Sequence, residues 1–114
     1  MKIQLTKYIV LSLLILPSVI YSQKIFSVEY ESQSDIKVFV VEYESQCDLK
    51  VYKVKYESQV EGNKGLWYFV KYPSQSDKKI YFVDYESQSD LRIFFVEYRS
   101  QSGWKNKSKK HLLY

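Results

Sequence analysis

The sequence predicts an all-β domain of about six short strands, formed by repeats of 13 residues. The first observation is the phrase Tyr-Glu-Ser-Gln at residues 30–33, which returns with small changes five more times. The second is a valine two residues before each repeat tyrosine, with an aromatic residue two before that valine. Side chains two apart lie on the same side of a strand, and a fixed period indicates a repeat architecture. Strand and turn are therefore expected to alternate along the chain.

Residues 1–22 are predicted to be a secretory signal peptide. Lys2 and Lys7 precede an apolar run over residues 8–21, which is shorter than the roughly 20 residues that a membrane-spanning helix needs. Cleavage after Ser22 would leave one domain, residues 23–114, without a transmembrane segment. An uncleaved anchor is the alternative, and the absence of a cysteine at the cut argues against a lipoprotein. We therefore expect an exported protein.

Each strand is expected to place three repeat residues on one face. These residues are the aromatics Phe26, Phe39, Tyr52, Tyr68, Tyr81 and Phe94, the valines Val28, Val41, Val54, Val70, Val83 and Val96, and the tyrosines Tyr30, Tyr43, Tyr56, Tyr72, Tyr85 and Tyr98. We expect this face to be buried first, with the tyrosine hydroxyls reaching partners in the turns. Stacking of the tyrosines on sugars or bases is the alternative.

The opposite face of the strands begins apolar and ends charged. Its first positions hold Ile25, Val38, Val51, Trp67, Ile80 and Ile93. In the second half of the chain the next position is also apolar, which predicts strands covered on both faces. The charged Lys53 at that position predicts an edge strand instead.

A turn is predicted after each repeat tyrosine, where Ser and acidic side chains can accept backbone N–H groups. The acids at one phase of the repeat are Asp35, Asp48, Asp77 and Asp90, with Glu61 at the same phase. Turn capping is favoured over a calcium site, because a calcium loop gathers several oxygens in one tight segment. Pro73 begins one turn, so that position is not expected to donate a strand hydrogen bond.

The period of 13 is interrupted once, between Tyr56 and Tyr72, where three residues are added. Two glycines in residues 60–65 predict a longer and more flexible loop there. The interruption separates three units from three units. This division predicts an internal pseudo-twofold or a duplicated half.

The charge balance argues against nucleic-acid binding by the repeats. Without Lys2 and Lys7, 15 basic residues stand against 13 acidic ones. Four of those basic residues, Lys105, Lys107, Lys109 and Lys110, form a terminal tail, and the remaining body is slightly acidic. The tail is expected to be solvated, and contact with anionic polymers or lipids is the alternative.

Few residues carry reactive chemistry. Cys47 is the single cysteine and stands where most repeats have serine, which favours packing over redox chemistry and leaves no intramolecular disulfide. His111 is the single histidine, so a histidine-rich zinc site cannot form and a catalytic triad would need this tail residue. No glycine-rich phosphate loop follows a strand. We expect no cofactor, no metal and no catalytic residue.

The chain resembles the 7(1) septoil knot domain family, a small bacterial family of unknown function. The resemblance rests on the Tyr-x-Ser-Gln-x-Asp units, on Gly-Leu-Trp-Tyr-Phe-Val at residues 65–70, which contains Trp67, and on the closing residues 103–114, which contain Trp104. It implies a compact β structure whose chain winds around itself into a deep toroidal knot with seven crossings. The closing segment, with Gly103, Trp104 and an apolar end, is expected to pack rather than to fray.

These observations predict an exported, monomeric and non-enzymatic domain. We expect it to act as a structurally robust scaffold or as a binding module for an unknown partner. An enzyme that uses the repeat carboxylates is the weakest alternative.

Overall fold

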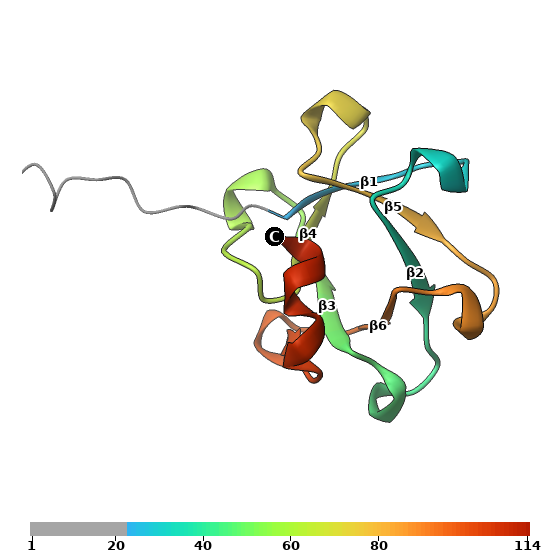
Figure 1. Ribbon diagram of the computed structural model, residues 1–114. Helices are drawn as coiled ribbons and strands as arrows, with labels where there is room; N and C mark the ends of the chain where they lie inside the picture. Colours follow the sequence, from blue (N-terminus) through green and yellow to red (C-terminus); the bar gives the residue numbers. More distant parts are fainter. Residues whose placement is uncertain (1–22) are drawn as a thin grey trace, which may run out of the picture.

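The computed structural model describes residues 23–114, which form a closed barrel of six parallel strands (Figure 1). The strands are β1 (Lys24–Ser27), β2 (Ile36–Val40), β3 (Leu49–Lys53), β4 (Leu66–Phe69), β5 (Lys78–Phe82) and β6 (Leu91–Phe95), and the short β7 (Gly103–Trp104) pairs antiparallel with β3. One strand comes from each repeat, as the sequence predicts. The all-β prediction is confirmed. No helix in this part of the chain is long and apolar enough to cross a membrane. The predicted signal peptide falls on residues 1–22, outside the described residues.

The strands do not follow one another around the barrel in chain order. Their order is β4-β1-β5-β2-β6-β3, and β3 closes the barrel by pairing with β4. Strands of the first half of the chain therefore alternate with strands of the second half. The predicted three-and-three division is present, but the two halves interleave around one barrel instead of forming separate units.

A stagger between neighbouring strands allows short connections. Ile80 of β5 pairs with Ser27, where β1 ends, and also with Ile36, where β2 begins. The end of β1 and the start of β2 therefore lie level with the same residue of β5, and the connection between them passes only that strand. Parallel strands usually need a crossover of a dozen or more residues, but a strongly tilted barrel removes that need.

Each connection contains one turn of 3-10 helix that projects outward from the barrel (Figure 1). These turns are η1 (Glu31–Gln33), η2 (Glu44–Gln46), η3 (Glu57–Gln59), η4 (Pro73–Gln75), η5 (Glu86–Gln88) and η6 (Arg99–Gln101). In η1 the N–H of Gln33 donates to the carbonyl of Tyr30 at 3.0 Å, and the Ser34 hydroxyl donates to the carbonyl of Glu31 at 2.7 Å. The predicted turns are confirmed. Pro73 begins η4, beyond the end of its strand, as expected.

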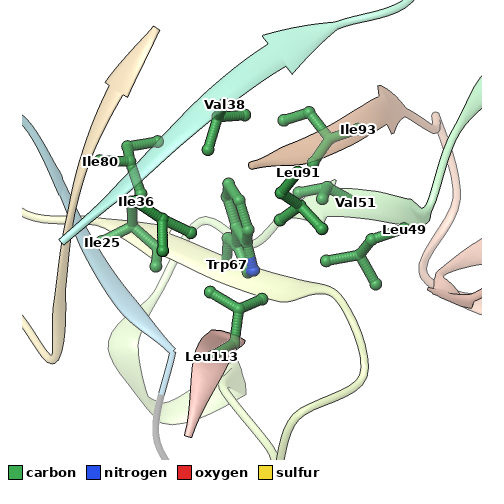
Figure 2. Packing of buried hydrophobic residues seen from close by; sticks show 10 residues of the cluster. All are labelled: Ile25, Ile36, Val38, Leu49, Val51, Trp67, Ile80, Leu91, Ile93 and Leu113. Atoms are coloured by element: carbon green, nitrogen blue, oxygen red, sulfur yellow. The ribbon is translucent and has the colours of Figure 1, made fainter. Parts of the chain in front are cut away.

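Trp67 fills the centre of the barrel with no exposed surface (Figure 2). The buried cluster around it consists of Ile25, Ile36, Val38, Leu49, Val51, Ile80, Leu91, Ile93 and Leu113. The indole N–H of Trp67 donates to Gln23 Oε1 at 3.0 Å, and Gln23 Nε2 donates to the carbonyl of Leu113 at 3.2 Å. The first and last parts of the domain thus meet at the central tryptophan.

The prediction of which face is buried first was wrong. The repeat tyrosines are 62–68% exposed, whereas the opposite face supplies Ile25, Val38, Val51, Trp67, Ile80 and Ile93, all fully buried. Of the repeat valines, only Val41 and Val54 are buried. A closed barrel has one interior face, and with six strands that interior is too narrow for six tyrosines. The smaller aliphatic side chains, with one tryptophan, fill it instead.

One end of the barrel is closed by phenylalanines from the second half of the chain. Phe69, Phe82 and Phe95 pack against the core from alternate strands. Lys53 lies between two of them, with its ammonium 4.3 Å from the centroid of the Phe95 ring and 5.5 Å from that of Phe69. The edge strand predicted from Lys53 was wrong, because β3 is paired on both sides. A cation–π contact, not an open edge, accommodates this charge.

The C-terminal segment covers the other end of the barrel. Leu113 belongs to η7 (Lys107–Leu113) and is 2% exposed within the core cluster. The indole N–H of Trp104 donates to the carbonyl of Asn63 at 3.0 Å, and Asn63 Nδ2 donates to the carbonyl of Lys110 at 2.9 Å. The closing segment packs, as predicted.

The loop over residues 60–65, predicted to be longer and more flexible, packs two of its residues against the rest of the domain. Asn63 and Gly65 are buried, and Asn63 bonds to the closing segment. Gly65 has φ of +83°, and a Cβ there would collide with the backbone oxygen of Lys50. At this position glycine is required for close packing and for a left-handed backbone conformation.

Candidate functional site

The six repeat tyrosines form a regular array of exposed aromatic side chains. Each precedes one 3-10 turn, and their exposures fall between 62% and 68%. Because the turns project all around the barrel, the tyrosines are distributed around it as well (Figure 1). Exposed aromatic side chains are enriched at binding surfaces. The array is therefore the candidate site, and its tyrosines are not core residues.

Grooves lie beside the turns, and those of the first and fifth repeats have equivalent linings. In the groove of the first repeat the lining consists of Phe26, Val28, Glu29, Tyr30 and Gln33, with Pro73 from one neighbouring repeat and Lys79 from the other. The groove of the fifth repeat uses Tyr81, Val83, Asp84, Tyr85 and Gln88, with Glu31 and Lys37 from its two neighbours. In both repeats, aromatic, aliphatic and polar side chains therefore surround an equivalent groove.

Four of the six turns are tied to the barrel by an equivalent ion pair. In each, the glutamate that begins the turn pairs with a basic residue on the strand two places further around the barrel. The pairs are Lys24 with Glu57 at 3.2 Å, Lys37 with Glu31 at 3.4 Å, Lys50 with Glu44 at 3.4 Å and Arg92 with Glu86 at 3.0 Å. Sequence reasoning missed this role, although a basic residue six before the repeat tyrosine in five repeats was a readable signal.

The repeat aspartates join neighbouring repeats. Asp35 Oδ2 accepts the backbone N–H of Lys79 at 2.8 Å, while the Asp35 N–H donates to the Lys79 carbonyl at 2.7 Å. Asp77, Asp90 and Asp48 make the same pair of bonds to Lys24, Lys37 and Arg92. The prediction that these aspartates cap their own turns was wrong. Each carboxylate accepts a backbone N–H from the neighbouring strand instead. These acids hold the barrel together.

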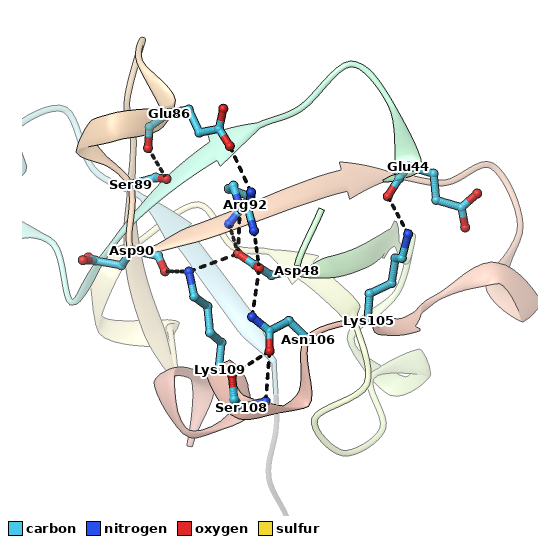
Figure 3. Close-up of polar contacts among 10 residues, drawn as sticks. All are labelled: Glu44, Asp48, Glu86, Ser89, Asp90, Arg92, Lys105, Asn106, Ser108 and Lys109. Atoms are coloured by element: carbon cyan, nitrogen blue, oxygen red, sulfur yellow. Dashed lines mark hydrogen bonds and ion pairs between the residues drawn. The ribbon is translucent and has the colours of Figure 1, made fainter. Parts of the chain in front are cut away.

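Asp48 is the one repeat aspartate that is fully buried, and it gathers several donors (Figure 3). Arg92 Nη2 donates to Asp48 Oδ1 at 3.0 Å, Asn106 Nδ2 donates to the same atom at 3.3 Å, and Lys109 Nζ lies 3.3 Å from Oδ2. Burial alone raises the pKa of the Asp48 carboxyl, but the hydrogen bonds from Arg92 and Asn106 and the charge of Lys109 outweigh it and lower that pKa. Asp48 therefore anchors the closing segment to the barrel as a carboxylate.

Two of the four tail lysines are engaged inside the domain. Lys109 contacts Asp48 and donates to the carbonyl of Asp90 at 3.1 Å, and Lys105 Nζ donates to the carbonyl of Glu44 at 3.2 Å (Figure 3). Lys107 is exposed and Lys110 is half-buried. The segment predicted to be a solvated tail is a packed lid, and only Lys107 and Lys110 keep ammonium groups that make no such contact.

Cys47 lies buried, and burial raises the pKa of its thiol. A thiol in that state is a weak nucleophile, which supports the packing interpretation. His111 Nδ1 lies 2.9 Å from the carbonyl of Ser108 within η7. Within residues 23–114 no three His, Cys, Asp or Glu side chains are grouped so as to hold a metal ion.

Comparison with known proteins bears on the whole repeat region. The model of the 7(1) septoil knot domain family matches residues 22–105. No curated protein and no solved structure gives a significant match. The matched region contains all six repeat strands, their turns and β7, and it ends before η7. The chain belongs to the 7(1) septoil knot domain family.

Proposed function

We propose that this domain is an exported, non-enzymatic binding module, and that the array of six repeat tyrosines is its binding surface. The observation that carries the proposal is the equal and high exposure of these tyrosines, 62–68%, above grooves of common lining. Exposed aromatic side chains on a rigid scaffold lose little conformational entropy on binding. The repeat aspartates, on which the enzyme alternative depends, accept backbone N–H groups of the neighbouring strands.

The test compares the purified protein with a variant in which the six repeat tyrosines are changed to serine. Both are passed over immobilised acidic and neutral polysaccharides at low salt. We expect retention of the unchanged protein and at least a tenfold weaker retention of the variant, since the stacking surface is removed. Far-ultraviolet circular dichroism checks that the variant folds, which is expected because the tyrosines are not in the core.

A second variant distinguishes the closing segment from the tyrosines. Lys107→Gln with Lys110→Gln removes the two uninvolved charges and leaves the contacts of Lys105 and Lys109 in place. If this variant loses retention and the tyrosine variant keeps it, the polyanion-binding alternative is correct and the proposal is not. Saturable turnover of a broad panel of hydrolase substrates, abolished by changing one carboxylate, would show an enzyme instead.

We further propose that the domain is knotted and resists mechanical unfolding. The interleaving of strands from the two halves supports this, because the chain circles the barrel twice and its second circuit lies between the strands of the first. Pulling on either end should tighten such a winding. We expect a tagged protein to be degraded by an unfoldase–protease motor at least tenfold more slowly than an unknotted β domain of equal thermal stability. Equally rapid degradation from either end contradicts the knot.

A further inference from the structure

The groove of the first repeat differs from its equivalents in one residue that changes its charge. At the first turn position on its rim, four repeats have glutamate, one has arginine, and η4 has Pro73. The basic residue that faces this position is Lys79. Its equivalents Lys24, Lys37, Lys50 and Arg92 each pair with a glutamate. Among residues 23–114 no acidic side chain pairs with the ammonium of Lys79.

The groove that lacks this glutamate is also the most spacious of the three. The cavity of the first repeat has a volume of about 520 Å³, whereas the equivalent cavities of the fifth and sixth repeats, both with a glutamate at this rim position, have about 300 and 280 Å³. A volume of about 300–1,000 Å³ is usual for small-molecule sites. Of these three grooves, only the first has both a volume in this range and a lysine, Lys79, that pairs with no acidic side chain of residues 23–114.

The lining defines the kind of ligand that fits. Phe26, Val28 and Pro73 offer an apolar wall, and the exposed ring of Tyr30 can cover the flat body of a ligand. Lys79 supplies one positive charge, and Glu29 on the same wall opposes a second negative charge on the ligand. The carboxylate of Asp35 accepts the backbone N–H of Lys79, and aspartates make the same contact with Lys37 and Arg92. Asp35 therefore does not distinguish the charge of this groove from that of its equivalents.

We propose that the groove formed by β1, η1, η4 and β5 binds a small monocarboxylate with an aromatic or aliphatic body. The carboxylate pairs with the ammonium of Lys79, in the place that a glutamate of the protein occupies in four other repeats. The body lies against Phe26, Val28 and Pro73. This inference rests on the proposed binding role, since Tyr30 is a member of the tyrosine array.

The test uses 3-phenylpropionate as probe and its uncharged amide as control. Binding is followed by the amide signals of the protein in two-dimensional NMR. We expect the carboxylate to shift signals of Phe26, Tyr30 and Lys79 in the unchanged protein, and the uncharged amide to bind at least tenfold more weakly. Equal affinity for the two probes, or shifts confined to other parts of the barrel, overturns the proposal.

Two substitutions use the repeat as its own control. Pro73→Glu introduces the glutamate of four other repeats, should pair with Lys79 and should weaken probe binding at least tenfold. Glu31→Pro is the reverse change at the equivalent position. It frees Lys37 and should create new shifts at Tyr81 and Tyr85. Each variant introduces a residue that the repeat already tolerates at this position, so both are expected to fold.

The outcomes separate this inference from the proposed function. If Pro73→Glu binds the probe as well as the unchanged protein does, the inference fails, whatever the polysaccharide experiment shows. If Glu31→Pro folds and gains no binding, the unpaired lysine does not decide binding and the inference is also overturned. Loss of probe binding in Pro73→Glu, with unchanged tyrosine-dependent retention on polysaccharide, supports both.

Discussion

Replacing Trp67 by alanine is expected to destabilise the domain more than any other single truncation. The indole has no exposed surface and is surrounded by the aliphatic side chains of the barrel (Figure 2). Truncation of a buried Trp leaves a cavity and costs about 3–5 kcal/mol. It also removes the donor that Gln23 accepts from, which leaves a buried amide oxygen without its partner.

Chemical denaturation followed by circular dichroism measures this effect. Tyr43→Ala is the matched control, because Tyr43 is also a large aromatic but is 63% exposed. We expect the control to change the free energy of unfolding by no more than about 0.5 kcal/mol. Similar losses in the two variants would contradict the assignment of Trp67 to the core and of the repeat tyrosines to the surface.

Asp48→Ala is expected to have the second-largest effect. The substitution removes the side-chain acceptor of Arg92, Asn106 and Lys109 together and so loosens the closing segment on the barrel. Breaking a buried ion pair costs about 3–5 kcal/mol, and we expect the lower end because the partner side chains are partly exposed. Asp35→Ala removes an exposed acid at the same phase of the repeat, whose carboxylate accepts the N–H of Lys79, and should cost about 1 kcal/mol.

The effect of Asp48 should depend on pH. Its pKa is lower in the folded protein than the ordinary value of 3.8, so the folded state binds fewer protons at this group. The stabilisation is therefore present above about pH 4 and is lost as pH falls through the folded pKa. We expect the difference in unfolding free energy between the unchanged protein and Asp48→Ala to be constant at neutral pH and to shrink in acid. A difference that grows in acid would contradict this assignment.

The candidate site was only partly predictable from sequence. The tyrosines, the turns and the position of Pro73 follow from the 13-residue period and from local preferences, since strands alternate their side chains and proline donates no hydrogen bond. The exposure of the tyrosines could not be predicted from the sequence, because both faces of the strands carry apolar residues and either could have been buried. The open groove needed the structure as well, because Pro73 and Lys79 reach it from repeats that are not consecutive with the first.

The sequence by itself determined the six strands, their all-β character and the family, because these depend on the repeat period and on short motifs along the chain. Only the tertiary structure decided which face lies inside the barrel, since closure limits the interior volume and leaves room for one tryptophan among aliphatic side chains. It also decided the interleaved strand order and the burial of Asp48. Apart from the β3–β4 pairing that closes the barrel, these depend on contacts between residues 44 or more positions apart. The tyrosines that mark the repeat in the sequence therefore became, in space, its exposed surface.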